Sequence, residues 1–328
     1  MKMYDNKGYL DFHKVLINGA TFTWIVGGRG TGKTFGALKA ILESGKKFIY
    51  LRNLKSQIEV VGSNTFSPFK PLNDMFGYNI ITDTAIKSIK GFYDDTNGEK
   101  TLIGLACALS SFSSLRGFDA SDYDYILFDE FIPKPDEVIR GNYGVQFIDF
   151  YETVSRNREL QGKEPLKVIG TANSNNIGNA IFIEFGLLNK VLQMIKKGKT
   201  YSKIEEKETA LFFLKDSPIS KQKANTALYK AISSDYSEMA LSNIFAQVDN
   251  RNVKSLEFNQ LRPLIQVKEL YIYYHNDGIY ISNHGFMKMP SVTIDNFKKS
   301  YRDICLAILF DRVLYENTES KIITQAYI

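Results

Sequence analysis

A glycine-rich loop near the start of the chain carries residue types that bind phosphate. Its eight residues are Gly27, Gly28, Arg29, Gly30, Thr31, Gly32, Lys33 and Thr34. They have the spacing of a phosphate-binding loop, in which glycines let backbone N–H groups face the phosphates. A β-favouring run precedes the loop, and a helix-forming run that Gly45 can end follows it. This context predicts a nucleotide site, with Lys33 on the β- and γ-phosphates and the Thr34 hydroxyl on Mg²⁺.

Two adjacent carboxylates, Asp129 and Glu130, follow the apolar run 125–128. A continuous apolar run is typical of a strand buried in a parallel sheet, and ligands gather at the carboxyl ends of such strands. We expect Asp129 to hold Mg²⁺ through its water shell and Glu130 to orient and deprotonate the attacking water. A kinase acting on a small molecule would not need the second carboxylate, whereas a hydrolase would.

The elements that must position these residues alternate between strand and helix patterns up to about residue 190, which predicts a mostly parallel α/β sheet. The predicted strands cover residues 22–26, 47–52, 86–92, 101–109, 125–128 and 166–170. Residues 56–80 read as irregular because they contain prolines and glycines. A helix is predicted from Val145 to about Leu160, and a polar cluster containing Thr171 and Asn173 closes the last strand.

The pattern changes after the sheet. Residues 216–250 are polar and helix-compatible and are interpreted as a small linker domain. Beyond them, Asn276-Asp277-Gly278 predicts a hairpin turn, and Ser291 or Thr293 could cap a long final helix through Asp311. Since 328 residues exceed what one core usually holds, the predicted division is an ATPase-type domain over 1–215, the linker over 216–250 and a C-terminal α/β domain over 251–328.

Composition bounds the function further. The chain is 44% hydrophobic and 23% charged, as in soluble globular proteins. No apolar run is long enough to span a membrane, and the N-terminus lacks the apolar core of a signal peptide. The two cysteines, Cys107 and Cys305, suggest neither a disulfide framework nor a zinc site, so we expect a reduced, cytoplasmic setting.

The net charge of +5 is concentrated in one stretch. Residues 190–230 contain ten lysines and four carboxylates and so carry +6. Such a stretch can follow a phosphate backbone, or it can be a solvated helical face, and charge alone does not separate the two. Three of its lysines are candidate DNA contacts: Lys196, Lys197 and Lys199.

Taken together and in order, several segments resemble the DNA-packaging ATPases of φ29-like tailed phages, relatives of large terminase subunits. They are the phosphate loop with an arginine inside it, the Phe48-Ile49-Tyr50-Leu51-Arg52 strand, Phe128-Asp129-Glu130-Phe131, the segment Thr153–Glu159 and the segment Tyr236–Asn243. The resemblance covers nearly the whole chain. It implies an ATPase domain with a catalytic glutamate, a linker, and a C-terminal domain resembling a vestigial RNase H-type nuclease.

The resemblance also implies partners and roles. It implies ATP and Mg²⁺, double-stranded DNA, and a homopentameric ring at the portal of an empty capsid in the host cytoplasm, with a packaging RNA left open. By carry-over, Arg156 resembles an arginine finger that enters a neighbouring active site, although Arg156 or Arg158 could instead cap its helix. Lys55 and Arg116 resemble basic residues presented in trans, and a solvated role is the alternative. Thr171 and Asn173 fall where a coupling motif would lie.

The C-terminal domain departs from an active nuclease, because no pair of carboxylates lies at the centre of a predicted strand, as two-metal chemistry would need. We therefore expect it to be inactive as a nuclease. Three other functions remain open: a helicase or loader acting on single strands, a small-molecule kinase, and a nucleotide-gated assembly protein. ATP turnover stimulated by double-stranded DNA and procapsids, but not by single strands, would separate the motor from all three.

Overall fold

The computed structural model describes residues 3–86, 89–111, 120–134, 137, 139–173, 177–214, 217–223, 225–231, 252–276, 278–285 and 287–328. The chain divides into two compact units. The first comprises Met1–Asn175 and Met194–Phe245, and the second comprises Asn176–Gln193 and Ala246–Ile328. In the part of the chain that the structure describes, no helix is long and apolar enough to cross a membrane.

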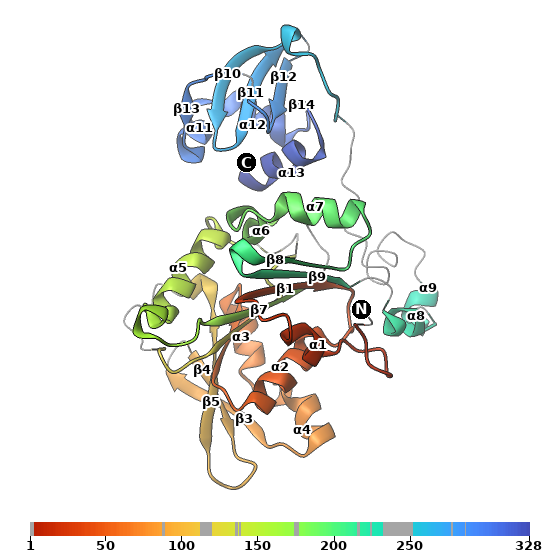
Figure 1. Cartoon of the computed structure of the whole chain (residues 1–328), viewed down its shortest axis with the longest axis vertical. Coiled ribbons are helices and arrows are strands. Elements are labelled where there is room, and N and C mark those ends of the chain that lie inside the picture. The colour runs from red at the N-terminus through yellow and green to blue at the C-terminus, as the bar shows by residue number, and fades with distance from the viewer. Residues whose placement is uncertain are drawn as a thin grey trace. The chain divides into compact units, whose positions relative to one another are not determined.

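The first unit is built on a nine-stranded sheet in the order β3-β4-β5-β2-β6-β7-β1-β9-β8 (Figure 1). The strands are β1 (Phe22–Gly27), β2 (Phe48–Arg52), β3 (Ile80–Ile86), β4 (Ile89–Asp94), β5 (Thr101–Ala108), β6 (Tyr125–Asp129), β7 (Lys167–Ala172), β8 (Tyr201–Ile204) and β9 (Thr209–Leu214). The six neighbouring strands β5, β2, β6, β7, β1 and β9 pair in parallel. At one edge, β4 pairs antiparallel with β5 and β3 pairs antiparallel with β4, and at the other edge β8 pairs antiparallel with β9. The predicted mostly parallel α/β sheet is therefore confirmed.

Helices cover both faces of this sheet, so alternate residues of one strand pack on opposite sides. Ile25 joins the core formed with α1 (Phe12–Leu16) and α2 (Lys33–Ser44). Its neighbour Trp24 packs on the other side, against Phe147 of α5 (Tyr143–Ser155), with ring centroids 5.7 Å apart. Figure 1 shows α1 and α2 on one side of the sheet and α5 on the other. This two-sided burial explains the apolar strand sequences.

The prediction that residues 56–80 are irregular is wrong. They contain most of α3 (Lys55–Val61), the short 3₁₀ helix η1 (Asn64–Phe66) and α4 (Lys70–Phe76), and they reach β3. Pro68 lies in the turn between η1 and α4, but the other residues that suggested breaks lie at helix ends. Pro71 is in the first turn of α4, and Gly77 ends that helix with φ of 72°. A proline is tolerated in a first turn, and a glycine is favoured as a left-handed cap.

The end of α5 sets the position of two predicted site residues. The helix ends at Ser155, and Arg156 adopts a left-handed backbone with φ of 42°. Arg158 begins the 3₁₀ helix η3 (Arg158–Gln161). Later in this unit, α8 (Pro218–Lys223) and α9 (Ala227–Ala231) follow β9.

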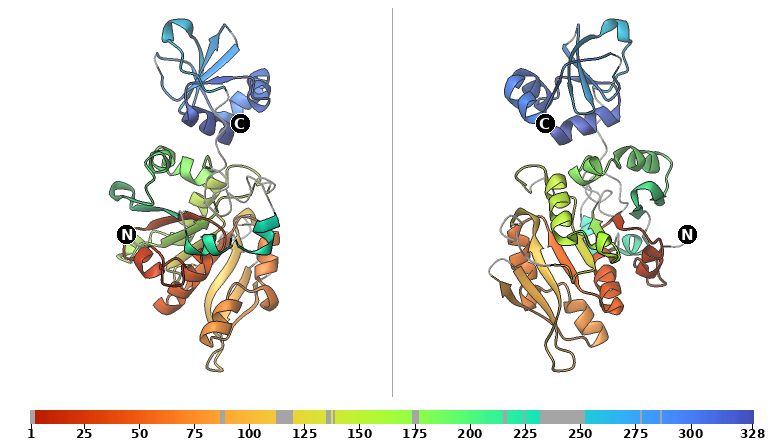
Figure 2. Two further views of the ribbon diagram at one scale, coloured as in Figure 1. Left: turned by 90° about the vertical axis from the view of Figure 1, so that its right-hand side faces the viewer. Right: turned by 60° about the vertical axis from the view of Figure 1, so that its left-hand side comes forward.

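The second unit contains a five-stranded sheet in the order β13-β10-β11-β12-β14. The strands are β10 (Arg262–Val267), β11 (Leu270–His275), β12 (Gly278–Ser282), β13 (Ser291–Val292) and β14 (Leu314–Tyr315), and the helices are α6 (Ala180–Glu184), α7 (Leu188–Lys196, which ends in the first unit), α11 (Ile294–Ser300), α12 (Arg302–Leu309) and α13 (Thr318–Tyr327). Strands β10 to β12 form an antiparallel meander, in which β11 and β12 make the predicted hairpin, although Asp277 itself lies outside the described residues. Figure 2 shows α13 lying against this sheet.

The predicted long final helix is divided into two. Thr293 caps α11, as predicted, by accepting a hydrogen bond from the backbone N–H of Asn296 at 3.3 Å. The helix ends at Ser300 because Tyr301 takes a non-helical conformation, with φ of −121° and ψ of 49°, and α12 then begins. No glycine or proline marks this break, and apolar residues recur at helical spacing on both sides of it.

Candidate active site

The phosphate loop connects β1 to α2, which is the strand–loop–helix arrangement that its motif predicts. Gly30 and Gly32 have φ of 75° and 82°, a backbone conformation in which a side chain would be strained. The backbone N–H of Leu10 donates to the Thr31 carbonyl at 3.0 Å, and the Thr31 hydroxyl donates to the Gly28 carbonyl at 3.1 Å. These hydrogen bonds fix the shape of the loop.

Lys33 is buried inside the loop that it belongs to. Its ammonium donates to the carbonyl oxygens of Gly27 and Gly28, each at 2.8 Å, and to Oδ1 of Asn173 at 3.3 Å. Burial lowers the pKa of Lys33 to about 7, although the charges of Asp129 and Glu130 act in the opposite direction. A phosphate placed beside this ammonium would supply a strong counter-charge and favour the charged form.

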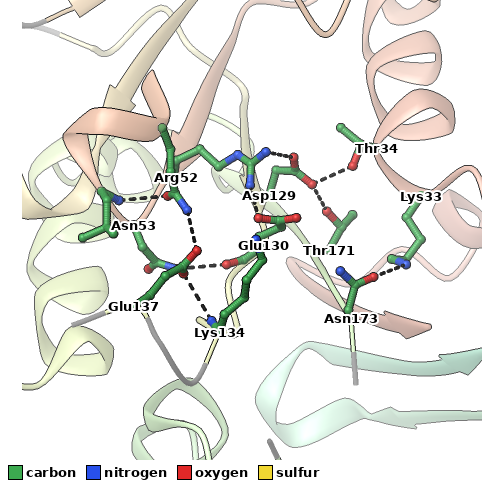
Figure 3. A network of polar contacts seen from close by, with 12 residues as sticks. Lys33, Thr34, Arg52, Asn53, Asp129, Glu130, Lys134, Glu137, Thr171 and Asn173 are labelled. Carbon is green, nitrogen blue, oxygen red and sulfur yellow. Dashed lines mark hydrogen bonds and ion pairs between the residues drawn. The ribbon is translucent and has the colours of Figure 1, made fainter. Parts of the chain in front are cut away.

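Asp129, at the end of β6, is the centre of a hydrogen-bond network (Figure 3). Its Oδ1 accepts from the hydroxyls of Thr34 and Thr171, each at 2.6 Å, and its Oδ2 accepts from the Tyr50 hydroxyl at 2.6 Å. Burial opposes ionisation of Asp129, but the nearby charge of Arg52 and these hydroxyls outweigh it and lower the pKa of the carboxyl. The side chain is therefore a fixed carboxylate facing the loop.

Glu130 follows directly and has a left-handed backbone, with φ of 55°. Such a conformation is uncommon for a residue other than glycine and costs about 1–3 kcal/mol, so it persists where neighbouring contacts hold it. Here Asn53 holds it by donating from its amide to the Glu130 carbonyl at 2.8 Å. The turn directs the Glu130 side chain, which is one-third exposed, to the same pocket as Asp129.

Arg52 is a site residue that sequence reasoning missed. Its guanidinium lies 3.3 Å from Oδ2 of Asp129, bonds the carboxylate of Glu130 and donates to the Tyr50 hydroxyl at 3.2 Å. Figure 3 shows it pointing toward both carboxylates. The available signal was its place at the carboxyl end of a parallel strand, since β2 lies directly beside β6.

These residues surround one pocket of about 360 Å³, a size suited to a small organic ligand. Its lining comprises Arg29, Gly30, Thr31, Gly32, Lys33, Thr34, Phe35, Asp129, Glu130, Lys134, Thr171, Ala172 and Asn173. The lining therefore combines the cations Arg29, Lys33 and Lys134 with the carboxylates Asp129 and Glu130. The structure thus brings the predicted loop, carboxylates, Thr171 and Asn173 together.

A divalent cation fits the same residues. The Thr34 hydroxyl and the Asp129 carboxylate are hard oxygen donors of the kind that Mg²⁺ prefers, and they are already 2.6 Å apart. Gly30 and Gly32, in the loop beside them, carry no side chains of their own, so backbone N–H groups of the loop can approach a phosphate closely. Thr34 and Asp129 are thus the residues that would hold Mg²⁺.

The other predicted residues lie outside this pocket or outside the described residues. Arg156 is exposed at the end of α5, whereas Arg158 is buried and donates to the Tyr123 carbonyl and to Asp124 within its own chain. Lys55 is exposed at the start of α3 and lies 3.9 Å from Glu59. Arg116 lies outside the described residues.

Three predicted DNA-contacting lysines lie where α7 turns toward β8. They are exposed and are called here the α7–β8 lysines: Lys196, Lys197 and Lys199. The turn is made possible by Gly198, whose φ is 65°. Their ammonium groups are therefore in contact with solvent, and a polyanion can approach them without any rearrangement of the chain.

The fold and the pocket define a phosphate-loop nucleotide-binding protein with a paired Asp–Glu at the end of the neighbouring strand. A family model for the podovirus DNA encapsidation protein (Gp16) matches residues 4–262, and the chain belongs to this family. It is therefore a phage DNA-packaging protein, as the resemblance predicted.

Individual relatives agree with this assignment. The DNA packaging protein of Bacillus phage B103 is 24% identical over 323 residues, covering 90% of this chain and 92% of that protein. A phi-28 gp11 DNA packaging motor structure has a TM-score of 0.66 at 18% identity and covers 98% of both chains. The N-terminal domain of the bacteriophage phi29 DNA packaging ATPase has a TM-score of 0.50 at 24% identity, covering 64% of this chain and 97% of that domain. These structural similarities show the fold.

Proposed function

We propose that this chain is an ATP-driven motor that moves double-stranded DNA into a preformed phage capsid, and that ATP is hydrolysed in the pocket described above. The single observation that carries the proposal is the convergence of Lys33, Thr34, Asp129 and Glu130 on one pocket, joined by the 2.6 Å contact between Thr34 and Asp129. A binding module would need the loop alone, whereas hydrolysis needs a base, and we assign that role to Glu130.

The chain's own residues account for the steps before hydrolysis. Backbone N–H groups of the loop bind the phosphates, and the Lys33 ammonium exchanges the carbonyls of Gly27 and Gly28 for phosphate oxygens. Asn173 accepts a hydrogen bond from the same ammonium. When the ammonium moves to the phosphates, the Asn173 amide is free to contact the γ-phosphate. Mg²⁺ held by Thr34 and Asp129 would neutralise charge on the β- and γ-phosphates.

Glu130 supplies the proton acceptor. Its carboxylate is partly exposed, so a water molecule can reach it, and the Arg52 guanidinium fixes its orientation. Glu130 takes a proton from that water as the water attacks the γ-phosphorus, whose bond to the bridging oxygen breaks. A general base of this kind contributes roughly 10²–10⁴-fold to turnover.

Neighbouring subunits complete the proposed site. Arg156 is exposed at the end of α5, so we assign it as the arginine finger of a homomeric, pentameric ring. Arg158 donates hydrogen bonds to the Tyr123 carbonyl and to Asp124, so we assign it a structural role. Lys55, exposed at the start of α3, is a second candidate for action in trans.

The remaining proposed partners follow from the family. The ring would work at the portal of a procapsid in the host cytoplasm, and the α7–β8 lysines would contribute a salt-dependent hold on DNA. A packaging RNA is a further candidate partner. The C-terminal domain, proposed to span 251–328 after a linker at 216–250, would make contacts rather than cut DNA.

The test is ATP turnover by the purified protein with procapsids, compared between double-stranded and single-stranded DNA. We expect stimulation by duplex DNA only, and its loss in Lys33→Ala. Lys39→Ala is the matched control, because Lys39 lies on the same helix but pairs with Glu43 at the surface. Stimulation by single strands alone would favour a helicase or loader, and turnover unaffected by Lys33→Ala would contradict the assigned pocket.

A further inference from the structure

A lysine from a separate part of the chain rests on the phosphate loop. Lys223, the last residue of α8, donates from its ammonium to the carbonyl oxygen of Arg29 at 2.9 Å. A Cβ built on Gly30 would lie 2.1 Å from the same nitrogen, so the ammonium occupies the space that this glycine leaves. The contact spans 194 positions of sequence.

The start of α8 is tied to the same loop through the N-terminal segment. The hydroxyl of Ser217, directly before α8, donates to the Gly8 carbonyl at 3.3 Å. A Cβ on Gly8 would meet Pro218 at 2.9 Å, so the two backbones approach closely. Two residues after Gly8, the N–H of Leu10 bonds Thr31 in the loop. Both ends of α8 are therefore anchored to the phosphate loop.

The electrostatics of the contact depend on the ligand. Without nucleotide, the Lys223 ammonium has a neutral carbonyl as its partner and is repelled by the charge of Lys33. A triphosphate in the loop would bring several negative charges, and its attraction for a nearby ammonium would exceed that repulsion. The hold of the loop on α8 is thus expected to be weak in the empty protein and stronger with nucleotide.

We propose that Lys223 is a positioning residue that couples nucleotide occupancy of the phosphate loop to the placement of α8. The inference rests on the proposed function, because it takes the loop to bind nucleotide. In the sequence, α8 and α9 precede the residues that lead to the C-terminal unit. A motor must transmit the state of its nucleotide to other parts of the chain, and Lys223 provides that link for α8.

The experiment measures hydrogen–deuterium exchange in peptides covering residues 217–231 of the full-length protein, with and without ADP or ATPγS. In the wild-type protein, nucleotide should slow exchange in α8 about fivefold, the effect of one net hydrogen bond. Lys223→Ala should abolish this protection, and Lys223→Arg should retain most of it. Lys230→Ala, an exposed lysine on α9, is the matched control and should behave like the wild type.

A second readout separates positioning from direct phosphate binding. Titration with fluorescent mant-ADP should give Lys223→Ala an affinity about fivefold below that of the wild type, because the coupling between the two sites is reciprocal, whereas Lys33→Ala should bind much more weakly still. Full nucleotide-dependent protection in Lys223→Ala, or loss of mant-ADP binding as severe as in Lys33→Ala, would overturn the inference. Failure of the wild-type protein to bind mant-ADP would refute the proposed function, and the coupling with it.

Discussion

Removing the Arg52 guanidinium should destabilise the nucleotide-free protein. Arg52 pairs with Asp129 and Glu130 and bonds Tyr50, and its side chain is 16% exposed. Deleting one partner of a fully buried ion pair costs about 3–5 kcal/mol. Because the Glu130 carboxylate is 32% exposed and can regain water, we expect a smaller loss for Arg52→Ala of roughly 2–3 kcal/mol.

This loss can be measured by thermal unfolding followed by circular dichroism. In a folding unit of about 150–250 residues, each kcal/mol shifts the midpoint by about 2–4 °C, so Arg52→Ala should melt about 5–10 °C lower. Arg52→Lys keeps the charge but not the forked donors, so its unfolding midpoint should lie between those of the wild type and Arg52→Ala. Mg²⁺ should raise the midpoint of Arg52→Ala more than that of the wild type, because a cation on Asp129 replaces part of the lost charge.

The matched control is Lys100→Ala, which removes an exposed ion pair with Asp83 at 2.8 Å and should leave the midpoint unchanged. An Arg52→Ala midpoint within about 1 °C of the wild type would refute this reasoning, because it would mean that the two carboxylates do not need the guanidinium.

Three further predictions concern the proposed motor. Mixing Arg156→Ala subunits with Glu130→Gln subunits, each inactive alone, should restore part of the ATPase, since some interfaces pair an intact finger with an intact base. Mixed rings that stay inactive would place Arg156 in its own subunit's site. Replacing the α7–β8 lysines with alanine should weaken duplex binding and flatten its salt dependence in filter-binding assays, and an unchanged slope would place them away from DNA. The full-length protein should not nick plasmid in Mg²⁺ or Mn²⁺, because strands β10, β11 and β12 carry no carboxylate of the kind that two-metal chemistry needs, and nicking that survives further purification would contradict this.

Much of the fold was predictable because burial leaves a clear pattern. The strands flanking the phosphate loop are buried on both sides, so they read as apolar runs, and Gly45 ends α2 as expected. The prediction of an irregular segment over residues 56–80 failed because Pro71 and Gly77 mark the ends of a helix rather than a loop. The break at Tyr301 has no such marker, since the apolar pattern continues across it.

The site was predictable where one short motif carries the chemistry. The phosphate loop is one continuous segment and Asp129-Glu130 is another, so residue types and spacing within each segment are enough to predict its role. Arg52 is 77 positions before Asp129, and it reaches Asp129 only because β2 lies beside β6 in the sheet. The order of strands in the sheet is not evident from the sequence of either strand. Lys223 reaches the loop from still farther along the chain. Contacts of this kind need the topology before a sequence can reveal them.

The central claim is that Glu130 activates the water that hydrolyses ATP. Glu130→Gln keeps the size of the side chain and removes its ability to accept a proton, so mant-ATP should bind with nearly wild-type affinity. The most direct measurement is single-turnover hydrolysis of bound ATP by this variant. The account predicts that the rate falls by about 10²–10⁴-fold. Hydrolysis at the wild-type rate would contradict it and remove Glu130 from the catalytic site.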